Sequence, residues 1–200
     1  MKNKIYIYGA SGHGLVVANI AKGIGYDEII YIDDSNDDYA SFNDIKANNH
    51  IPLALGIGKN IIRKKIFDKA SRYNFKIETL IHPTSVIGED VKIGIGTIIM
   101  PNVVINASSQ IGIGVILNSS SVIEHENIIG DFVHISPNVS LAGNVSVGDL
   151  THIGIGSAVI PGTNIGYNCI IGAGSVVLND INNNKVAVGI PSRAIKDKDE

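Results

Sequence analysis

"VKIGIGTIIMPNVVINASSQIGIG", residues 91–114, carries an aliphatic residue at every sixth position. The spacing runs from Ile81 to Val177 without an insertion or a polar substitution. The members of the series are Ile81, Ile87, Ile93, Ile99, Ile105, Ile111, Leu117, Ile123, Ile129, Ile135, Leu141, Val147, Ile153, Val159, Ile165, Ile171 and Val177. An α-helix cannot keep this period, because 3.6 residues per turn do not divide six. Short strands that turn a corner every six residues can keep it.

A second regular position lies two residues before the aliphatic one, and small or β-branched residues occupy it. They are Ser85, Val91, Thr97, Val103, Ser109, Val115, Ser121, Val133, Val139, Val145, Thr151, Ser157, Thr163, Cys169 and Ser175. Residues two apart in a strand share a face, so both positions are expected to point inward. The sequence therefore predicts a parallel β-solenoid of hexapeptide repeats with three faces per coil, its coils about 4.8 Å apart. Asn127 breaks the rule beside His125, and such departures tend to occur at functional sites.

Residues 1–80 show a different pattern, in which short strands alternate with helices. Strands are expected at residues 5–8, at 28–35, at 51–56 and at 75–81, and helices at 14–25 and 60–74, the second with its basic residues on the outer side. The polar segment 35–50 is expected to be a surface loop. Alternation of this kind predicts a parallel sheet with crossover helices. We therefore expect an α/β, Rossmann-like domain over residues 1–80 and the solenoid with a short C-terminal tail over residues 81–200.

Glycines and carboxylates follow the strands of this first domain. Gly9, Gly12 and Gly14 come after the first strand, Asp33 and Asp34 end the second, and Gly56 ends the third. Ligands bind at the carboxyl ends of the strands in such sheets, where glycines let backbone N–H groups approach phosphate and a carboxylate can bind ribose. The spacing is G-x-x-G-x-G and not G-x-G-x-x-G, which favours a mononucleotide or nucleotide sugar over a dinucleotide. A turn that merely requires glycine is the alternative.

Composition excludes several classes of protein. The chain has 16 basic and 19 acidic residues and no basic stripe, so nothing favours a nucleic-acid partner. One cysteine, Cys169, rules out an internal disulfide and suits a reducing cytoplasm, which is the expected location. The first apolar run is too short for a signal peptide, and no later run is long enough to span a bilayer.

The chain resembles the bacterial sugar O-/N-acyltransferases of the NeuD/PglD type. The resemblance rests on "IYIYGASGHG", the "DD" pair, "RKKI", "VVINASSQIGIGVILNSSSVIEHENIIGDFVHISPNVSLAGNVSVG" and "VGIPSRAIK", and it covers almost the whole chain. It implies a left-handed β-helix, a hand that periodicity alone leaves open. It also implies a homotrimer with acetyl-CoA in the groove between neighbouring solenoids. An amino-sugar nucleotide would lie between the N-terminal domain and the solenoid.

His125 is the candidate catalytic residue. It falls at a corner of its coil, and Glu124 and Glu126 flank it. A carboxylate that is hydrogen-bonded to an imidazole fixes the tautomer and increases its basicity. The resemblance makes His125 the general base and Glu126 its charge partner, and we expect the backbone N–H of Gly143 to stabilise the developing oxyanion.

The remaining site residues divide between the two substrates. The nucleotide-sugar side comprises Ser11, Gly12, His13, Asp33, Asp34, Gly56 and Asn118. The acetyl-CoA side comprises His134, Gly143, Ile155, Pro191 and a coenzyme contact expected of a glycine at position 173, where this chain has Ala173 between two glycines. His152 lies one coil beyond His134 and should stack near it.

The resemblance implies acetyl transfer from acetyl-CoA to the 4-amino group of a UDP-2-acetamido-4-amino-2,4,6-trideoxyhexose, without a metal. Cys169 should not be a nucleophile, because the CoA thiolate leaves readily without a covalent intermediate. The alternatives are an O-acetyltransferase of the sialic-acid type, an N-acetyltransferase of another nucleotide-linked 4-amino sugar, a solenoid scaffold without catalysis, and a zinc hydratase that binds its metal through three histidines.

Overall fold

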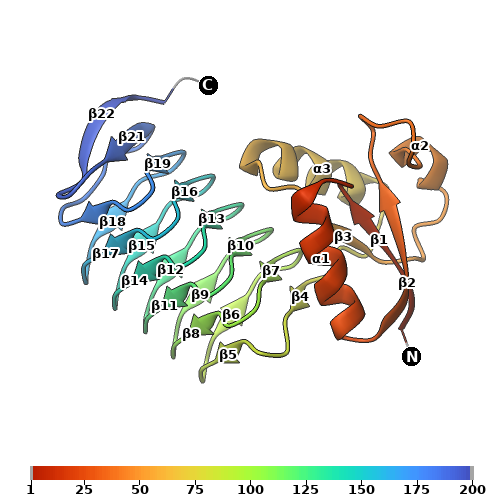
Figure 1. The fold of residues 1–200 in the computed structure, drawn as a ribbon, viewed down its shortest axis with the longest axis horizontal. Helices are drawn as coiled ribbons and strands as arrows, with labels where there is room; N and C mark the ends of the chain where they lie inside the picture. The colour runs from red at the N-terminus through yellow and green to blue at the C-terminus, as the bar shows by residue number, and fades with distance from the viewer. Residues whose placement is uncertain (1, 199–200) are drawn as a thin grey trace.

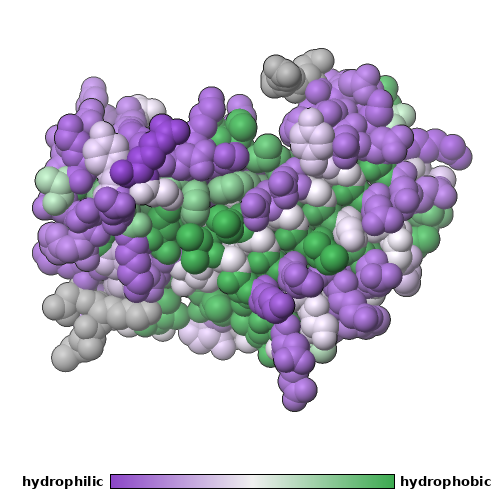
Figure 2. Space-filling model, turned by 180° about the vertical axis from the view of Figure 1, so that it is seen from behind, coloured by the Kyte–Doolittle hydropathy of each residue, from purple (hydrophilic) through white to green (hydrophobic). Residues whose placement is uncertain are grey.

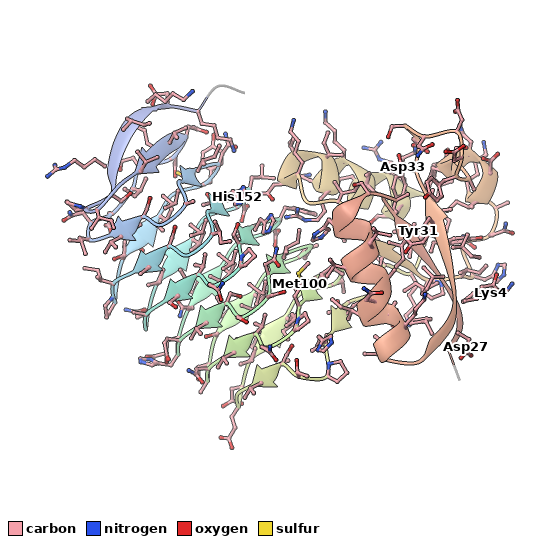
Figure 3. The ribbon with its side chains drawn as sticks, viewed as in Figure 1. Lys4, Asp27, Tyr31, Asp33, Met100 and His152 are labelled. Carbon is pink, nitrogen blue, oxygen red and sulfur yellow. The ribbon has the colours of Figure 1, made fainter. Side chains whose placement is uncertain are left out.

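The computed structural model describes residues 2–198 and has an α/β region followed by a long solenoid (Figure 1). The α/β region contains a sheet of three parallel strands, β1 (Lys2–Tyr8), β2 (Tyr26–Ile32) and β3 (Leu53–Leu55), in the order β2-β1-β3. The parallel sheet expected from the alternating pattern is thus confirmed with three strands, and all their carboxyl ends lie along one edge. The strand expected at residues 75–81 is wrong except at its end, where only Leu80–Ile81 forms a strand, which belongs to the solenoid. Asp33 marks that edge in Figure 3, while Asp27 and Lys4 lie toward the opposite one.

Helices cover both faces of this sheet. One face packs with α1 (Gly12–Gly23) in an apolar core that continues into the solenoid through Leu80 and Ile98. The other face packs against α2 (Phe42–Ile45) and α3 (Asn60–Arg72). Helix α2 lies in the segment expected to be a loop. It forms because Ser41 and Asp44 make a capping box and because Phe42 and Ile45 are buried beneath it.

The solenoid has three faces, each a parallel sheet of two-residue strands. The first face comprises β4 (Leu80–Ile81), β7 (Ile98–Ile99), β10 (Ile116–Leu117), β13 (His134–Ile135), β16 (His152–Ile153) and β19 (Ile170–Ile171). The second comprises β5 (Val86–Ile87), β8 (Val104–Ile105), β11 (Val122–Ile123), β14 (Ser140–Leu141), β17 (Ala158–Val159) and β20 (Val176–Val177). The third comprises β6 (Lys92–Ile93), β9 (Gln110–Ile111), β12 (Ile128–Ile129), β15 (Ser146–Val147) and β18 (Asn164–Ile165). Each residue pairs with the residue 18 positions further along the chain, such as Ile99 with Leu117, so one coil holds three hexapeptides.

The interior follows the predicted pattern. The aliphatic series is buried from Ile99 to Val177, and the small series is buried from Thr97 to Ser175. Five hydroxyls of the small series, those of Ser85, Thr97, Ser109, Thr151 and Ser157, bond to the carbonyl 15 residues further on, as Thr97 does to Gly112. These bonds tie neighbouring coils together where side-chain packing is thinnest. Ile87 stays partly exposed, because its coil lies at the open end of the stack.

The C-terminal segment is a β-hairpin and not the tail expected from the sequence. Strands β21 (Lys185–Val188) and β22 (Arg193–Asp197) pair antiparallel, and β21 continues the first face beyond β19. The hairpin covers the last coil, where an unpaired sheet edge would otherwise remain. Among the described residues, no helix has both the length and the hydrophobicity needed to cross a bilayer.

Candidate active site

Three glycines bring the carboxyl edge of the N-terminal sheet together. A Cβ on Gly9 would lie 2.6 Å from the Gly56 carbonyl oxygen, and one on Gly14 would overlap the Gly9 carbonyl. Gly9 also has φ +110°, a backbone conformation that other residues rarely adopt. These glycines allow β1, α1 and β3 to approach, so Gly56 has a packing role in the turn. Gly12, by contrast, faces open space at the start of α1, since a Cβ added there would have nothing within 4 Å.

Asp33 and Asp34 lie at the same edge, and both carboxylates already have partners. Asp33 accepts hydrogen bonds from the Ala10 N–H (3.0 Å) and from the backbone and hydroxyl of Ser35. These bonds lower the pKa of Asp33 below its ordinary value, the Ser35 hydroxyl contributing most. Asp33 therefore connects the end of β2 to the glycine turn after β1.

Asp34 braces a different part of this edge. It accepts from the Tyr8 hydroxyl (2.5 Å), the Lys69 ammonium (2.8 Å) and the Phe42 N–H (2.7 Å). Burial opposes ionisation, but these donors prevail and its pKa is lowered. Asp34 thus ties β1, α2 and α3 together, a structural task that the sequence did not indicate.

His13, at the start of α1, contacts the first face of the solenoid. Its ring centroid lies 6.3 Å from that of His134, and the rings of His134 and His152 stack at 4.7 Å with 2° between their planes. The predicted stacking of His134 and His152 is confirmed, but both rings are partly buried and His134 faces His13 of α1, so the pair does not lie on an open outer face. Figure 3 shows His152 on the side of the solenoid turned toward α3.

Burial keeps these histidines neutral. Desolvation, with a smaller effect of the Arg63 charge, lowers the pKa of His13 to about 4. Desolvation lowers the pKa of His134 to about 3, helped by His152, Arg63 and His13, while the nearby Gly58 backbone acts in the opposite direction. The pKa of His152 is also lowered, chiefly by burial. All three imidazoles are therefore uncharged at neutral pH.

The hydrogen bonds of this cluster fix the ring orientations. The Asn118 amide nitrogen lies 3.2 Å from Nε2 of His134, and the Ser136 hydroxyl lies 2.8 Å from Nε2 of His152. The Asn118 carbonyl oxygen already accepts from the Ser119 N–H, so the amide N–H is the group that faces His134. His134 then carries its proton on Nδ1. Within residues 2–198, no group of three or more His, Cys, Asp or Glu side chains is arranged to hold a metal ion.

His125 lies at the corner between the second and third faces, after β11. Its Nδ1 is 3.0 Å from Oε2 of Glu126, and both side chains are mostly exposed. The ring lies directly over Gly143 of the next coil, since a Cβ there would come within 2.5 Å of Cε1 and Nε2 of His125. Across the described chain, no acceptor bonds the Gly143 N–H. The corner therefore presents a free imidazole nitrogen beside a free backbone donor.

Asn127 determines the shape of this corner. It is fully buried, and its amide nitrogen donates to the carbonyls of Glu124 (2.5 Å) and Ala142 (3.1 Å). Its oxygen accepts from the Val145 N–H (3.0 Å). Serine or threonine elsewhere in the small series makes fewer of these bonds, so the longer asparagine ties together the two corners that carry His125 and Gly143. The sequence exception thus has a physical cause.

Two of the positions expected to bind acetyl-CoA, Ile155 and Ala173, lie along the corner between the first and second faces, whereas His134 lies in β13 of the first face and Gly143 at the corner between the second and third faces. Ile155 and Ala173 follow β16 and β19, and the Gly174 N–H donates to the Ile155 carbonyl (2.8 Å). Asn118, expected on the nucleotide-sugar side, lies at the same corner after β10. Ile155 is exposed, as is Ile190 next to Pro191. This corner therefore offers an apolar, glycine-flanked strip suited to an extended thioester arm.

One chain does not bring all the predicted residues together. Of the nucleotide-side residues, His13 lies over the first face beside His134, whose ring Asn118 contacts. His125, Glu126 and Gly143 lie at the corner opposite that face, since the solenoid is triangular in section. The general-base candidate is thus separated from His134 by the body of its own solenoid.

Arg63 lies beside this site, where the sequence pattern does not place it. The pattern predicts Arg63 on the outer side of its helix with the other basic residues, yet it is fully buried between α3 and the solenoid. Its neighbours Ile66 and Ala70 are the buried positions of the same helical face, so helical spacing could have indicated its burial.

Comparison with known proteins places this architecture in a family. Residues 4–70 match the family described as the PglD N-terminal domain. PerB from Caulobacter crescentus, solved with CoA and GDP-perosamine, is 31% identical with a TM-score of 0.93, over 98% of this chain and 99% of that one. The acetyltransferase domain of PglB from Neisseria gonorrhoeae, solved with acetyl coenzyme A, is 32% identical with a TM-score of 0.90, over 98% and 100%. WeeI from Acinetobacter baumannii AYE is 25% identical with a TM-score of 0.87, over 96% and 99%.

These matches extend over both parts of the molecule. The solenoid, of about 6 turns, matches a left-handed β-helix, as the resemblance implied. From end to end, the chain belongs to the family of sugar acetyltransferases of the PglD/NeuD type.

Proposed function

We propose that this protein transfers the acetyl group of acetyl-CoA to the 4-amino group of a nucleotide-linked amino sugar, with a UDP-2-acetamido-4-amino-2,4,6-trideoxyhexose as the acceptor. The observation that carries the proposal is the corner where His125, paired with Glu126, lies over Gly143. Family membership supports the reaction class, since PerB was solved with CoA and an amino-sugar nucleotide.

The corner offers the two groups that amide formation from a thioester needs. Nε2 of His125 accepts a proton from the amine as its nitrogen attacks the thioester carbonyl carbon. The Gly143 N–H stabilises the negative charge that develops on the carbonyl oxygen. The C–N bond forms, the C–S bond breaks, and the CoA thiolate leaves and takes up the proton from His125. Glu126 holds the imidazole with its proton on Nδ1, so that Nε2 is the acceptor.

The two substrates would reach this corner from different sides. The exposed, apolar strip of Ile155, Ala173 and Pro191 would hold the pantetheine arm of acetyl-CoA. The open start of α1 at Ser11 and Gly12 would take the diphosphate through its free backbone N–H groups. His134 would contact the acetyl donor as a neutral ring, since its Nε2 faces Asn118 and its buried Nδ1 lies toward the Gly58 backbone.

A second copy of the chain would complete the site. His125 and His134 lie on opposite sides of one solenoid, so a substrate between them requires two subunits. The strand residues that point outward on the second face are Val86, Val104, Val122, Ser140, Ala158 and Val176, all uncharged and mostly apolar. Figure 2 shows broad apolar surface along the solenoid from behind.

A cyclic trimer with the second faces inward would cover this surface. It would also set each His125 corner against the Ile155 corner of the next subunit, closing the ring.

The acceptor is tested by direct assay. Purified protein is incubated with acetyl-CoA and, in parallel, with the UDP-4-amino sugar, GDP-perosamine and sialic acid, and thiol release and product mass are measured. Preferred acetylation of the UDP-4-amino sugar supports the proposal. A preference for GDP-perosamine would show that the acceptor is not the proposed UDP-linked sugar. Acetylation of a sialic-acid hydroxyl would show that the reaction is O-acetylation and not N-acetylation.

The shared site is tested by complementation. His125→Ala and His134→Ala subunits, each nearly inactive alone, are coexpressed in equal amounts. If each site takes one histidine from each of two subunits, about a quarter of the sites in a random mixture are intact. Recovery to about that level supports the shared site, and no recovery in a mixed assembly verified by mass spectrometry contradicts it.

A further inference from the structure

Arg63 makes an unusual set of contacts for a buried cation. Its Nε donates to the Gly114 carbonyl (2.7 Å), and Nη2 donates to the carbonyls of Phe132 (2.8 Å) and Val133 (3.2 Å). Nη1 donates to Ile57 (3.1 Å) and Gly58 (3.0 Å), and Nη2 also reaches Oδ1 of Asn60 (3.0 Å). No carboxylate within residues 2–198 pairs with it. The guanidinium fork instead satisfies backbone carbonyls, a geometry that a lysine cannot reproduce.

These carbonyls belong to successive coils. Gly114 and Phe132 occupy equivalent corners, and Asn60 extends the series by donating to Leu150 (2.9 Å) and Thr151 (3.1 Å). The side chains of Asn60 and Arg63, in the first turn of α3, therefore bind the backbone of three stacked corners between the third and first faces. Phe67 packs against Phe132 beside these bonds, with centroids 5.4 Å apart. The contact fixes both the height and the rotation of α3 on the solenoid.

The same side chain also fixes the loop between β3 and α3. Ile57 and Gly58 directly follow Gly56, which packs against Gly9 and Gly14 of the glycine turn. The Gly58 backbone lies close enough to His134 to influence its pKa. Arg63 thus connects the first face of the solenoid to the edge of the sheet where the nucleotide sugar is expected.

The charge of Arg63 acts on the same region. The titratable groups near it are His13 from α1, His134 from β13 and His152 from β16, and Lys198 also acts on His152. Burial lowers the pKa of Arg63 to about 9, so it stays protonated at neutral pH. A cation held beside three histidines disfavours their protonation.

We propose that Arg63 is a positioning residue of the active site: by clamping α3 and the Ile57–Gly58 loop onto three coils, it sets the position of the nucleotide-sugar edge relative to His134. The inference rests on the proposed function only in its kinetic consequence. The contacts of Arg63 exist in the free protein, so their effect on α3 and the Ile57–Gly58 loop can be tested without substrate.

The variants are Arg63→Lys, which keeps the charge and loses the planar guanidinium, and Asn60→Ala, which releases the third coil and removes one acceptor of Arg63 while leaving its bonds to the first two coils. Lys65→Met is the matched control, because Lys65 is exposed on the same helix. With the UDP-4-amino sugar, Arg63→Lys is expected to raise KM for the sugar nucleotide about tenfold or more and to leave KM for acetyl-CoA within about twofold, as a misplaced docking edge requires. Asn60→Ala should have a smaller effect in the same direction, and Lys65→Met none.

Amide hydrogen exchange supplies a readout that is independent of turnover. In Arg63→Lys, exchange should be faster at residues 56–66 than in wild type, while the coils beyond β16 exchange at the wild-type rate. Histidine NMR of an Arg63→Gln variant should show higher imidazole pKa values for His13 and His134.

The outcomes separate the two proposals. If wild-type protein acetylates no nucleotide amino sugar, the proposed function fails, and the exchange and NMR experiments still decide the clamp. Wild-type exchange together with unchanged KM in Arg63→Lys would overturn the inference. An equal rise in KM for both substrates, together with faster amide exchange along the whole chain, would also overturn the inference, because Arg63 would then contribute only to global stability.

Discussion

At the scale of single residues, the imidazole of His125 is the group on which the proposed chemistry depends. His125→Ala should lower kcat by a factor on the order of 10² to 10⁴, the usual contribution of a general base, because the attacking amine loses its proton acceptor. The side chain is exposed, so its loss should not affect folding. Steady-state kinetics and thermal unfolding together check this expectation.

The control for His125 is His50→Ala, since His50 is an exposed histidine far from the corner in sequence. It should retain wild-type kinetics. A folded His125→Ala protein that turns over at the wild-type rate would remove His125 from the mechanism.

Gly143 is the second residue at this corner that cannot be replaced without moving the His125 ring. In Gly143→Ala, the new methyl group would lie within 2.5 Å of the His125 ring and would push the imidazole away from the backbone donor. We expect kcat to fall at least about tenfold, since small displacements of a catalytic group are costly. Gly23→Ala is the control, because nothing lies within 4 Å of its added Cβ. Unaltered kcat in Gly143→Ala would show that the ring position over Gly143 is unimportant.

At the scale of structural elements, Asn127 ties the strand-to-strand corners together. Asn127→Ala leaves the Ala142 carbonyl and the Val145 N–H without partners and the Glu124 carbonyl with the Ser109 hydroxyl alone, and we expect a loss of about 2–4 kcal/mol in the free energy of unfolding. Asn127→Ser should keep the bond to Ala142 that serine and threonine make at equivalent positions, and so should retain more stability while kcat falls. Thr97→Val, at an equivalent site remote from His125, should lose stability without a change in kcat. Urea unfolding and kinetics distinguish these variants, and equal kcat in all three would contradict a positioning role for Asn127.

The glycine turn after β1, together with the Asp33 carboxylate bonded to it, is the second structural element that a substitution can test. Asp33 holds the Ala10 N–H, so Asp33→Ala should loosen the turn and raise KM for the sugar nucleotide about tenfold, with KM for acetyl-CoA unchanged. Asp34→Ala should instead destabilise the domain, because Tyr8, Phe42 and Lys69 lose their common acceptor. Kinetics and thermal unfolding of the pair test this division. Equal effects of Asp33→Ala on both substrates would assign it a folding role.

At the scale of the whole molecule, the contact between the N-terminal domain and the solenoid should be sensitive to acid. The unfolded chain binds protons at its histidines near pH 6.5, whereas folded His13 and His134 bind them only near pH 4 and pH 3. Between pH 6.5 and about 4 the unfolded state therefore binds more protons, and stability falls with falling pH by up to about 1.4 kcal/mol per pH unit for each histidine. Urea unfolding at pH 7.5, 6.5 and 5.5 measures this slope.

The variant that isolates this effect is His13→Asn, which should be less sensitive to pH between 6.5 and 5.5. His50→Asn should behave as wild type. The lowered pKa values of Asp33 and Asp34 act at lower pH, since their contribution is lost only as those carboxylates protonate. Stability that is constant from pH 7.5 to 5.5 would refute the burial of neutral histidines at this contact.

The sequence alone determined the solenoid, its inner residues and the alternation of parallel strands with helices in the N-terminal region. It could do so because the hexapeptide period reports directly which side chains point inward, from Ile99 to Val177, and because glycine is required where strand ends meet at Gly9. It also marked the corner of His125 through the exception at Asn127. These features depend on residues that are close in sequence or related by a fixed repeat.

Only the tertiary structure decided how the two parts contact each other. The burial of Arg63, the approach of His13 to His134 and the bonds of Asp34 join segments that no common period relates. The same holds for His125 above Gly143, where the contact depends on the rotamer and on the stagger of adjacent coils. Periodicity specifies the face on which a residue lies, whereas the partner across that face is set by docking, by carbonyls that must be satisfied and by the space that a missing Cβ leaves open.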